Sequence, residues 1–297
     1  MTQLEVRLKS IAERVGGTMG FAVRNEATGE EARLRADEIF PTASVFKIPL
    51  LVFLYALAEQ GRIDLDARVS LSESDVVPGS GVLKELAPGL RPTVRDLAKL
   101  MIVVSDNLAT DAIWSLVNGG SAVTDFIQGF GLRKTSVPWN TGDLLSLVVG
   151  IDPPYSRRES YERVTEKLLH LDYDRSGNGF QCDDRNNVTT PAEMMELLTL
   201  IMRREIVSPA ACEEMLDILR AQQSNDRIPL YLPRTWNVAH KTGTIGPIRC
   251  DAGIILMPEG TAVVFCAFAK DVPVEEWVAC DRAMAEAALA AYDSFMP

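Results

Sequence analysis

The hydrophobic positions change their spacing twice along the chain. Residues 4–15 repeat with the period of a helix, and two short stretches of strand character, 18–24 and 31–35, flank a turn-rich connector and predict a β-hairpin. From about residue 44 to residue 220 the spacing is helical. Strand patterns then return before a closing helix at about 274–294.

The middle of the chain therefore predicts helices, and the part that follows predicts strands. The predicted helices span residues 46–60, 94–101, 107–117, 122–129, 160–171, 192–204 and 209–221. The predicted strands span residues 236–242, 252–257 and 261–269, with a turn at Pro258-Glu259-Gly260 between the last two.

This order of elements predicts an α+β fold. Strands from both ends of the chain join most simply in one antiparallel five-stranded sheet, flanked by the terminal helices. We expect residues 1–42 and 222–297 to form this α/β domain. Residues 43–221 are expected to form an all-α domain that carries a long loop insertion at about 139–187.

Charge and composition exclude several classes of partner. The chain has 297 residues with a formal net charge of −11, which disfavours binding to nucleic acid. Its longest apolar run, residues 48–58, is too short for the roughly 20 residues of a membrane span. We expect a small-molecule substrate as the partner, and the sequence does not indicate an oligomeric state.

Metal chemistry and export have little support in the sequence. The 2 histidines and 5 cysteines include no C-x-x-C pair, so we expect no metal site and no cofactor. Residues 1–17 lack the apolar segment of a secretory leader. The sequence as written therefore predicts a cytoplasmic protein, or a periplasmic or secreted one if a leader has been removed.

Ser44 and Lys47 are the first candidate reactive groups. In Ser44-Val45-Phe46-Lys47 the spacing of three places both side chains on one helical face, where the lysine can reach the hydroxyl. A nucleophile and its base would have this arrangement. Taken alone, the segment is more typical of a serine that caps a helix, followed by a surface lysine.

Two further motifs change this interpretation. Ser105-Asp106-Asn107 precedes an amphipathic helix, and Lys241-Thr242-Gly243-Thr244 lies on a predicted strand. The ordered set S-x-x-K, S-D-N and K-T-G resembles the penicillin-recognising serine hydrolases, and class A β-lactamases most of all. Thr189-Thr190-Pro191 ahead of a helix is similar to that family too, so the resemblance covers nearly the whole chain.

The resemblance implies a β-lactamase/transpeptidase-like fold and a role for each motif. Ser44 would be acylated, and Lys47 would assist its deprotonation. Ser105 would pass a proton to the leaving nitrogen, and Asn107 would hold the substrate amide and Lys47. Lys241 and Thr242 would attract the substrate carboxylate, beside Gly243. The backbone N–H groups of Ser44 and Thr244 would form the oxyanion hole.

The sequence departs from class A β-lactamases in the segment that should supply the deacylation base. The family's E-x-x-L-N pentapeptide is absent. Glu166 begins the nearest match, Glu166-Lys167-Leu168-Leu169-His170, although its charged surroundings are also typical of a solvated helix face. Another alignment of Pro138-Trp139-Asn140 would place Asn140 at the position of the glutamate. The sequence does not decide between them.

The resemblance implies a class A-like serine β-lactamase that opens the ring through an acyl-enzyme on Ser44, an activity associated with antibiotic resistance. A penicillin-binding protein, a D,D-peptidase or an esterase with slow deacylation is the alternative on the same scaffold. A non-hydrolytic covalent sensor is another. Arg249 is a further candidate for binding a carboxylate, although an arginine beside a strand is often only solvated.

Overall fold

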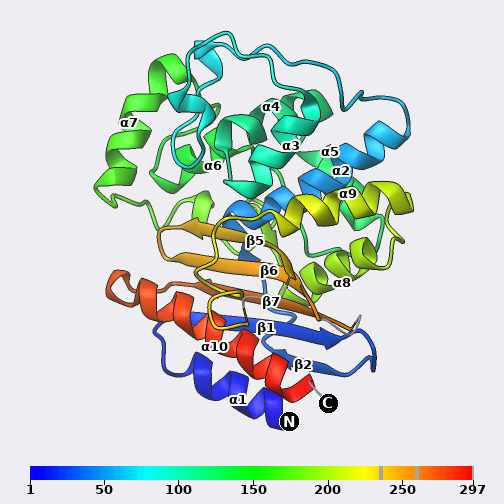
Figure 1. Ribbon diagram of the computed structural model, residues 1–297. Helices are drawn as coiled ribbons and strands as arrows, with labels where there is room; N and C mark the ends of the chain where they lie inside the picture. Colours follow the sequence, from blue (N-terminus) through cyan, green and yellow to red (C-terminus); the bar gives the residue numbers. More distant parts are fainter. Residues whose placement is uncertain (234–236, 258–260, 296–297) are drawn as a thin grey trace. The chain divides into compact units, whose positions relative to one another are not determined.

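The computed structural model describes residues 1–233, 237–257 and 261–295, and its chain divides into two compact units. The first unit consists of Met1–Val45 and Thr189–Pro297, and the second of Phe46–Val188. The first unit contains the sheet, and the second is helical (Figure 1).

The first unit contains the predicted five-stranded antiparallel sheet, in the order β2-β1-β7-β6-β5. Its strands are β1 (Thr18–Asn25), β2 (Glu31–Leu34), β5 (Asn237–Ile245), β6 (Ile248–Leu256) and β7 (Ala262–Lys270). The strands from the two ends of the sequence meet where β1 pairs with β7. This confirms the α+β fold class. Trp236 and the turn at residues 258–260 fall outside the described residues.

Helices cover both faces of this sheet (Figure 1). Phe21 of β1 and Phe265 of β7 join the core beneath α1 (Gln3–Ala12) and α10 (Trp277–Phe295), with ring centroids 6.1 Å apart. Because strand side chains alternate, Arg24 points to the other face, where it donates to Glu196 of α8 (Pro191–Met202) at 2.9 Å. Helix α9 (Pro209–Arg220) packs against β5.

The second unit is built around helix α2 (Lys47–Glu59), whose residues from Lys47 to Leu57 are all buried. An apolar sequence without a polar face favours such a central position. The other helices of this unit are α3 (Val94–Val103), α4 (Asn107–Val117), α5 (Ser121–Gln128), α6 (Thr141–Val148) and α7 (Arg157–Leu169). Helix α2 packs against α3, α4 and α5.

Two features differ from the expected domain plan. Helices α8 and α9 belong to the unit with the sheet, so the boundary lies after Val188 and not at residue 221. Helical periodicity shows that a face is buried but does not identify what buries it. The segment 139–187 is also not a loop, because it contains α6 and α7. Helix α6 was not predicted from the sequence; it begins Thr141-Gly142 and is capped by Asn140.

The two-residue strands β3 (Phe40–Pro41) and β4 (Val188–Thr189) and five short 3₁₀ turns complete the described elements. The turns are η1 (Ala43–Phe46), η2 (Glu73–Asp75), η3 (Leu83–Glu85), η4 (Asn178–Phe180) and η5 (Val274–Glu276). Within the described part of the chain, no helix has the length and apolar character that crossing a membrane requires.

Candidate active site

Ser44 lies in the 3₁₀ turn η1, which leads directly into α2 at Lys47. Between Pro41 and Leu57, Ser44 is the one residue that is partly exposed, and all the others are buried. Its hydroxyl makes no hydrogen bond within the described residues. The turn therefore presents a single accessible hydroxyl, three residues before the lysine that begins the next helix.

The K-T-G strand β5 passes directly against the Ser44 turn. A Cβ atom at Gly243 would lie 2.5 Å from the Thr42 carbonyl oxygen and 3.1 Å from the Ser44 backbone nitrogen. Only glycine allows this approach, because the neighbours are backbone atoms that cannot rotate away. Lys241 is fully buried and its Nζ donates to the Thr242 carbonyl at 2.7 Å, whereas Thr244 is exposed. Ser44 and Gly243 are thus brought together in the first unit, and Thr244 follows Gly243 on the same strand.

Lys47 is fully buried in the second unit and is surrounded by hydrogen-bond acceptors. Its Nζ lies 2.9 Å from the Ser105 carbonyl oxygen, 3.1 Å from Ser105 Oγ and 2.9 Å from Asn107 Oδ1. Burial lowers the pKa of Lys47 to about 7, against the opposing attraction of Asp111 and Asp106. At neutral pH a large fraction of this amine is therefore unprotonated and able to accept a proton.

A tight turn before α4 fixes the Lys47 acceptors. Ser105 has a left-handed backbone with φ 55°, and its carbonyl oxygen accepts a hydrogen bond of 2.7 Å from Ser80 Oγ. Asn107 donates from Nδ2 to the Pro78 carbonyl at 2.8 Å. Gly79 makes room for that amide, because a Cβ atom there would lie 2.6 Å from Asn107 Nδ2. Ser80 belongs to none of the three motifs, and its role was not predicted from the sequence.

Two carboxylates influence Lys47 electrostatically. Asp106 caps α4 through Ala109 N at 3.0 Å, and its other oxygen accepts from Val82 N and Leu83 N at 2.7 and 2.9 Å. Asp111 lies one helical turn after Asn107, and burial raises its pKa to about 6. Asp111 was not predicted, because a single aspartate within a helix carries no motif.

Asp111 also anchors α6, which lies within the segment that was expected to be a loop. It accepts hydrogen bonds from Thr141 N at 2.7 Å and Gly142 N at 2.9 Å, both in the first turn of α6. Asn140 caps the same helix, since its Oδ1 accepts from Asp143 N at 2.7 Å. A side-chain amide is not a general base, and the role that the structure shows for Asn140 is the cap of α6.

Glu166 does not join the Lys47 cluster. It lies on α7 with an exposed side chain, and its carbonyl oxygen accepts from His170 N at 3.1 Å. Within the described residues its carboxylate makes no hydrogen bond or ion pair. The structure therefore brings Lys47, Ser105 and Asn107 together and leaves the proposed deacylation base out.

Arg227 is a buried cation behind the K-T-G strand that the sequence analysis missed. It donates to Asp281 at 2.7 Å, to the Gly243 carbonyl at 3.0 Å and to Thr244 Oγ1 at 2.6 Å. Arg249, the arginine that the sequence suggested, is buried and pairs with Asp281 at 3.3 Å. Arg227 is therefore the arginine that supports the K-T-G strand. Its role could not be predicted from the sequence, because its partners are distant along the chain.

Replacing Arg227 by methionine is expected to lower the free energy of unfolding by about 3 kcal/mol, because Asp281 and two backbone carbonyls lose their buried donor. Arg220→Met is the matched control, since Arg220 pairs with Glu213 and Asp217 in a partly exposed network and its loss should cost about 1 kcal/mol or less. Urea denaturation followed by circular dichroism measures both. Equal losses would contradict a stabilising role for Arg227.

The fold and the three motifs define a hydrolase of the penicillin-recognising type. The chain belongs to the β-lactamase enzyme family, whose model matches residues 3–295. β-Lactamase L2 of Stenotrophomonas maltophilia is 27% identical over 238 residues, which cover 80% of this chain and 67% of that protein.

Solved structures show the same fold over nearly the whole chain. An ancestral class A β-lactamase (GNCA) has a TM-score of 0.81 and 27% identity, and the match covers 99% of this chain and 100% of that one. PBP-A has a TM-score of 0.79 and 25% identity, covering 99% and 96%. A mutant of PBP-A has been solved as an acyl-enzyme complex with penicillin G.

Proposed function

We propose that this protein is a serine β-lactamase that opens the β-lactam ring through an acyl-enzyme on Ser44. The Ser44 hydroxyl gives its proton to the Lys47 amine as Oγ attacks the ring carbonyl carbon. The C–N bond of the ring then breaks, and Ser105 passes a proton to the leaving nitrogen. Water hydrolyses the resulting ester and frees Ser44.

This proposal rests on the protonation state of Lys47. A lysine with an ordinary pKa would be charged at neutral pH and could not accept a proton. Burial brings the pKa of Lys47 to about 7, close to the value that suits a general base. The three oxygen atoms within 3.1 Å also hold the amine in one position: the neutral amine can donate to the Ser105 carbonyl and Asn107 Oδ1, and the Ser105 hydroxyl can donate to it.

The K-T-G strand supports a role in substrate binding. Lys241, Thr242 and Thr244 would bind the carboxylate of the substrate, with Arg227 fixing Thr244 through the hydrogen bond of 2.6 Å. The backbone N–H groups of Ser44 and Thr244 would stabilise the oxyanion. The close approach of Gly243 to Ser44 N supports this pairing, because it keeps strand and turn at a fixed separation.

A slowly deacylating penicillin-binding protein is the second candidate. The observations that favour it are the exposed Glu166 and the capping role of Asn140, since neither supplies a base for the ester hydrolysis. The similarity to PBP-A agrees with this candidate. A D,D-peptidase acting on wall peptides would share the same acyl-Ser44 intermediate.

Time-resolved intact-protein mass spectrometry with benzylpenicillin and a chromogenic cephalosporin tests the proposal. A mass gain mapped to Ser44 that clears as product accumulates is the result expected of a β-lactamase. An adduct on Ser44 that persists, without product, would replace this function by the second candidate. No adduct and no product with either compound would overturn acyl transfer to β-lactams.

Replacing Asp111 by asparagine is expected to shift the acidic limb of the acylation pH profile downward by about half a pH unit or more. The attraction of Asp111 raises the pKa of Lys47, so its removal should lower that pKa further and make the neutral amine available at lower pH. Stopped-flow acylation between pH 5 and pH 9 measures the shift. Asp125→Asn on α5 is the control, and an unmoved profile for Asp111→Asn would show that Asp111 does not act on the base.

A further inference from the structure

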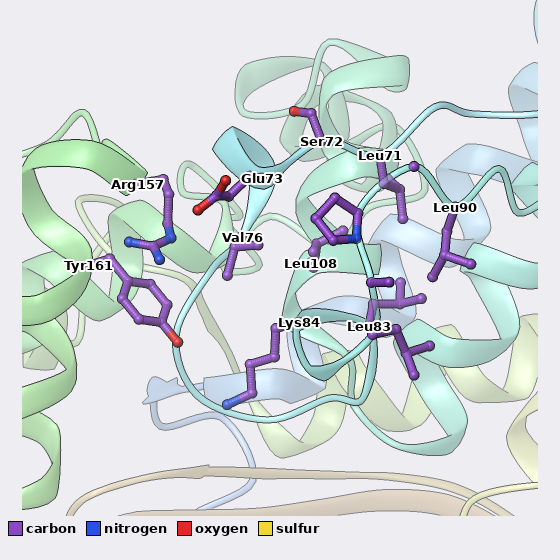
Figure 2. A pocket seen from close by; sticks show the side chains of 14 residues that line it. Leu71, Ser72, Glu73, Val76, Leu83, Lys84, Leu90, Leu108, Arg157 and Tyr161 are labelled. Atoms are coloured by element: carbon purple, nitrogen blue, oxygen red, sulfur yellow. The ribbon is translucent and has the colours of Figure 1, made fainter.

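A pocket in the helical unit lies among residues that have no role in the proposed reaction. Its volume is about 310 Å³, and it is lined by 11 residues of the segment between Leu71 and Leu90, by Leu108 of α4, and by Arg157 and Tyr161 of α7. Figure 2 shows the leucines on one side of the pocket and Arg157 and Tyr161 across from them. This size lies at the lower end of pockets that hold small organic ligands.

The apolar side of the pocket consists of Leu71, Leu83, Leu90 and Leu108. Leu71, Leu83 and Leu108 are at most 8% exposed, whereas Leu90 at the rim is 38% exposed. A ligand would mainly cover the exposed part of Leu90 and the small apolar surface left on the other three, which favours binding by roughly 25 cal/mol per Å².

The polar side presents a cation without a counter-ion. The guanidinium of Arg157 lies over the ring of Tyr161, 4.0 Å from its centroid. Arg157 Nε is buried and has no hydrogen-bond partner in the described residues, and Arg157 forms no ion pair there. Arg157 is itself only partly buried, so the terminal nitrogen atoms of its guanidinium can pair with an anion in the pocket without displacing a counter-ion.

Two other charged groups line the pocket. Lys84 already pairs with Glu85 at 3.6 Å, so Arg157 is the lining cation that has no ion-pair partner in the described residues. Glu73 lines the same side but is exposed, and no ion pair joins it to Arg157. The planar guanidinium of Arg157 suits a carboxylate, with which it can form two parallel charge-assisted hydrogen bonds.

The walls of the pocket are fixed without a ligand. Leu83 N donates to Asp106 at 2.9 Å, and Leu71 N donates to the Leu90 carbonyl at 3.1 Å. The Tyr155 hydroxyl donates to the Val76 carbonyl at 2.8 Å and so links the α7 side to the segment before α4. A pocket held open in this way needs little ordering when a ligand binds.

We propose that this pocket binds a small amphiphilic carboxylate, with its chain against the leucines and its carboxylate on the Arg157 guanidinium. A medium-chain fatty acid has this chemistry. The site does not depend on acyl transfer, because none of Arg157, Tyr161 and the four leucines belongs to the proposed reaction.

Isothermal titration of the full chain with octanoate tests the proposal. Octanoate should bind saturably at one site, whereas octyltrimethylammonium should not bind. Arg157→Gln should weaken octanoate binding about tenfold or more, because a charge-assisted hydrogen bond is lost. Arg158→Gln is the matched control, since Arg158 is exposed and does not line this pocket, and its affinity should stay within about twofold.

Two further variants test whether octanoate binds in this pocket and whether its binding is independent of Ser44. Leu90→Asp places a carboxylate on the apolar rim and should also abolish octanoate binding, while Ser44→Ala should leave it unchanged. Absence of saturable binding to the wild-type chain would overturn the proposal, and so would equal affinity of the Arg157→Gln variant. Failure of the Ser44 chemistry would not affect this result.

Discussion

Replacing Ser44 by alanine is expected to abolish the covalent adduct and to lower product formation by a factor of about 10⁴ or more, because the attacking oxygen is lost. The folded state should be unaffected. Ser44 is partly exposed and its hydroxyl makes no hydrogen bond within the described residues, so no buried donor or acceptor loses a partner. Intact-protein mass spectrometry with benzylpenicillin and thermal unfolding measure the two effects.

The control for this prediction is Ser294→Ala. Ser294 lies in α10 of the same unit, and its hydroxyl donates to the Ala290 carbonyl at 2.8 Å. The variant should be acylated at the wild-type rate. If Ser44→Ala still gained the mass of the antibiotic, another residue would be the nucleophile and the proposed mechanism would be wrong.

Local patterns predicted most of the fold because both kinds of element have strong periodicity. The predicted helix 107–117 matches α4 without error, and the hairpin and the C-terminal strands meet in one sheet. The prediction failed where the signal is weak or not local. Helix α6 begins with a glycine at its second position, and the assignment of α8 and α9 depends on packing that sequence spacing does not encode.

The candidate site shows the same limit. Motifs located Lys47, Ser105 and Asn107, and the structure brings these three together. The groups that modify them were not predictable, because their action depends on distance in space. Asp111 acts on Lys47 through charge, and Arg227 reaches Thr244 from 17 residues away along the chain. Neither residue belongs to a recognisable motif.

Replacing Lys47 by methionine or arginine is expected to lower the acylation rate by a factor of about 10³ or more. Methionine cannot accept a proton, and arginine remains charged at every relevant pH, so both remove the base. Stopped-flow measurement of acylation tests this. Lys99→Met, at an exposed position on α3, is the control and should acylate normally. Acylation by Lys47→Arg at the wild-type rate would mean that Lys47 contributes charge and not basicity.

The stability of the same variants should change with pH in a defined direction. In the wild-type chain the native state loses the Lys47 proton near pH 7, whereas the unfolded state keeps it until about pH 10.5. The unfolded state therefore binds more protons in this window, and the contribution of Lys47 to stability rises with pH by up to about 1.4 kcal/mol per unit. Lys47→Met lacks this contribution.

Urea denaturation at pH 7 and pH 9 should therefore show a larger gain for the wild-type chain than for Lys47→Met, while Lys99→Met follows the wild type. Parallel pH dependence in the wild-type and Lys47→Met chains would show that the amine is not held uncharged by burial. Burial would then not lower the pKa of Lys47, and the proposed deprotonation of Ser44 by Lys47 would have no physical cause.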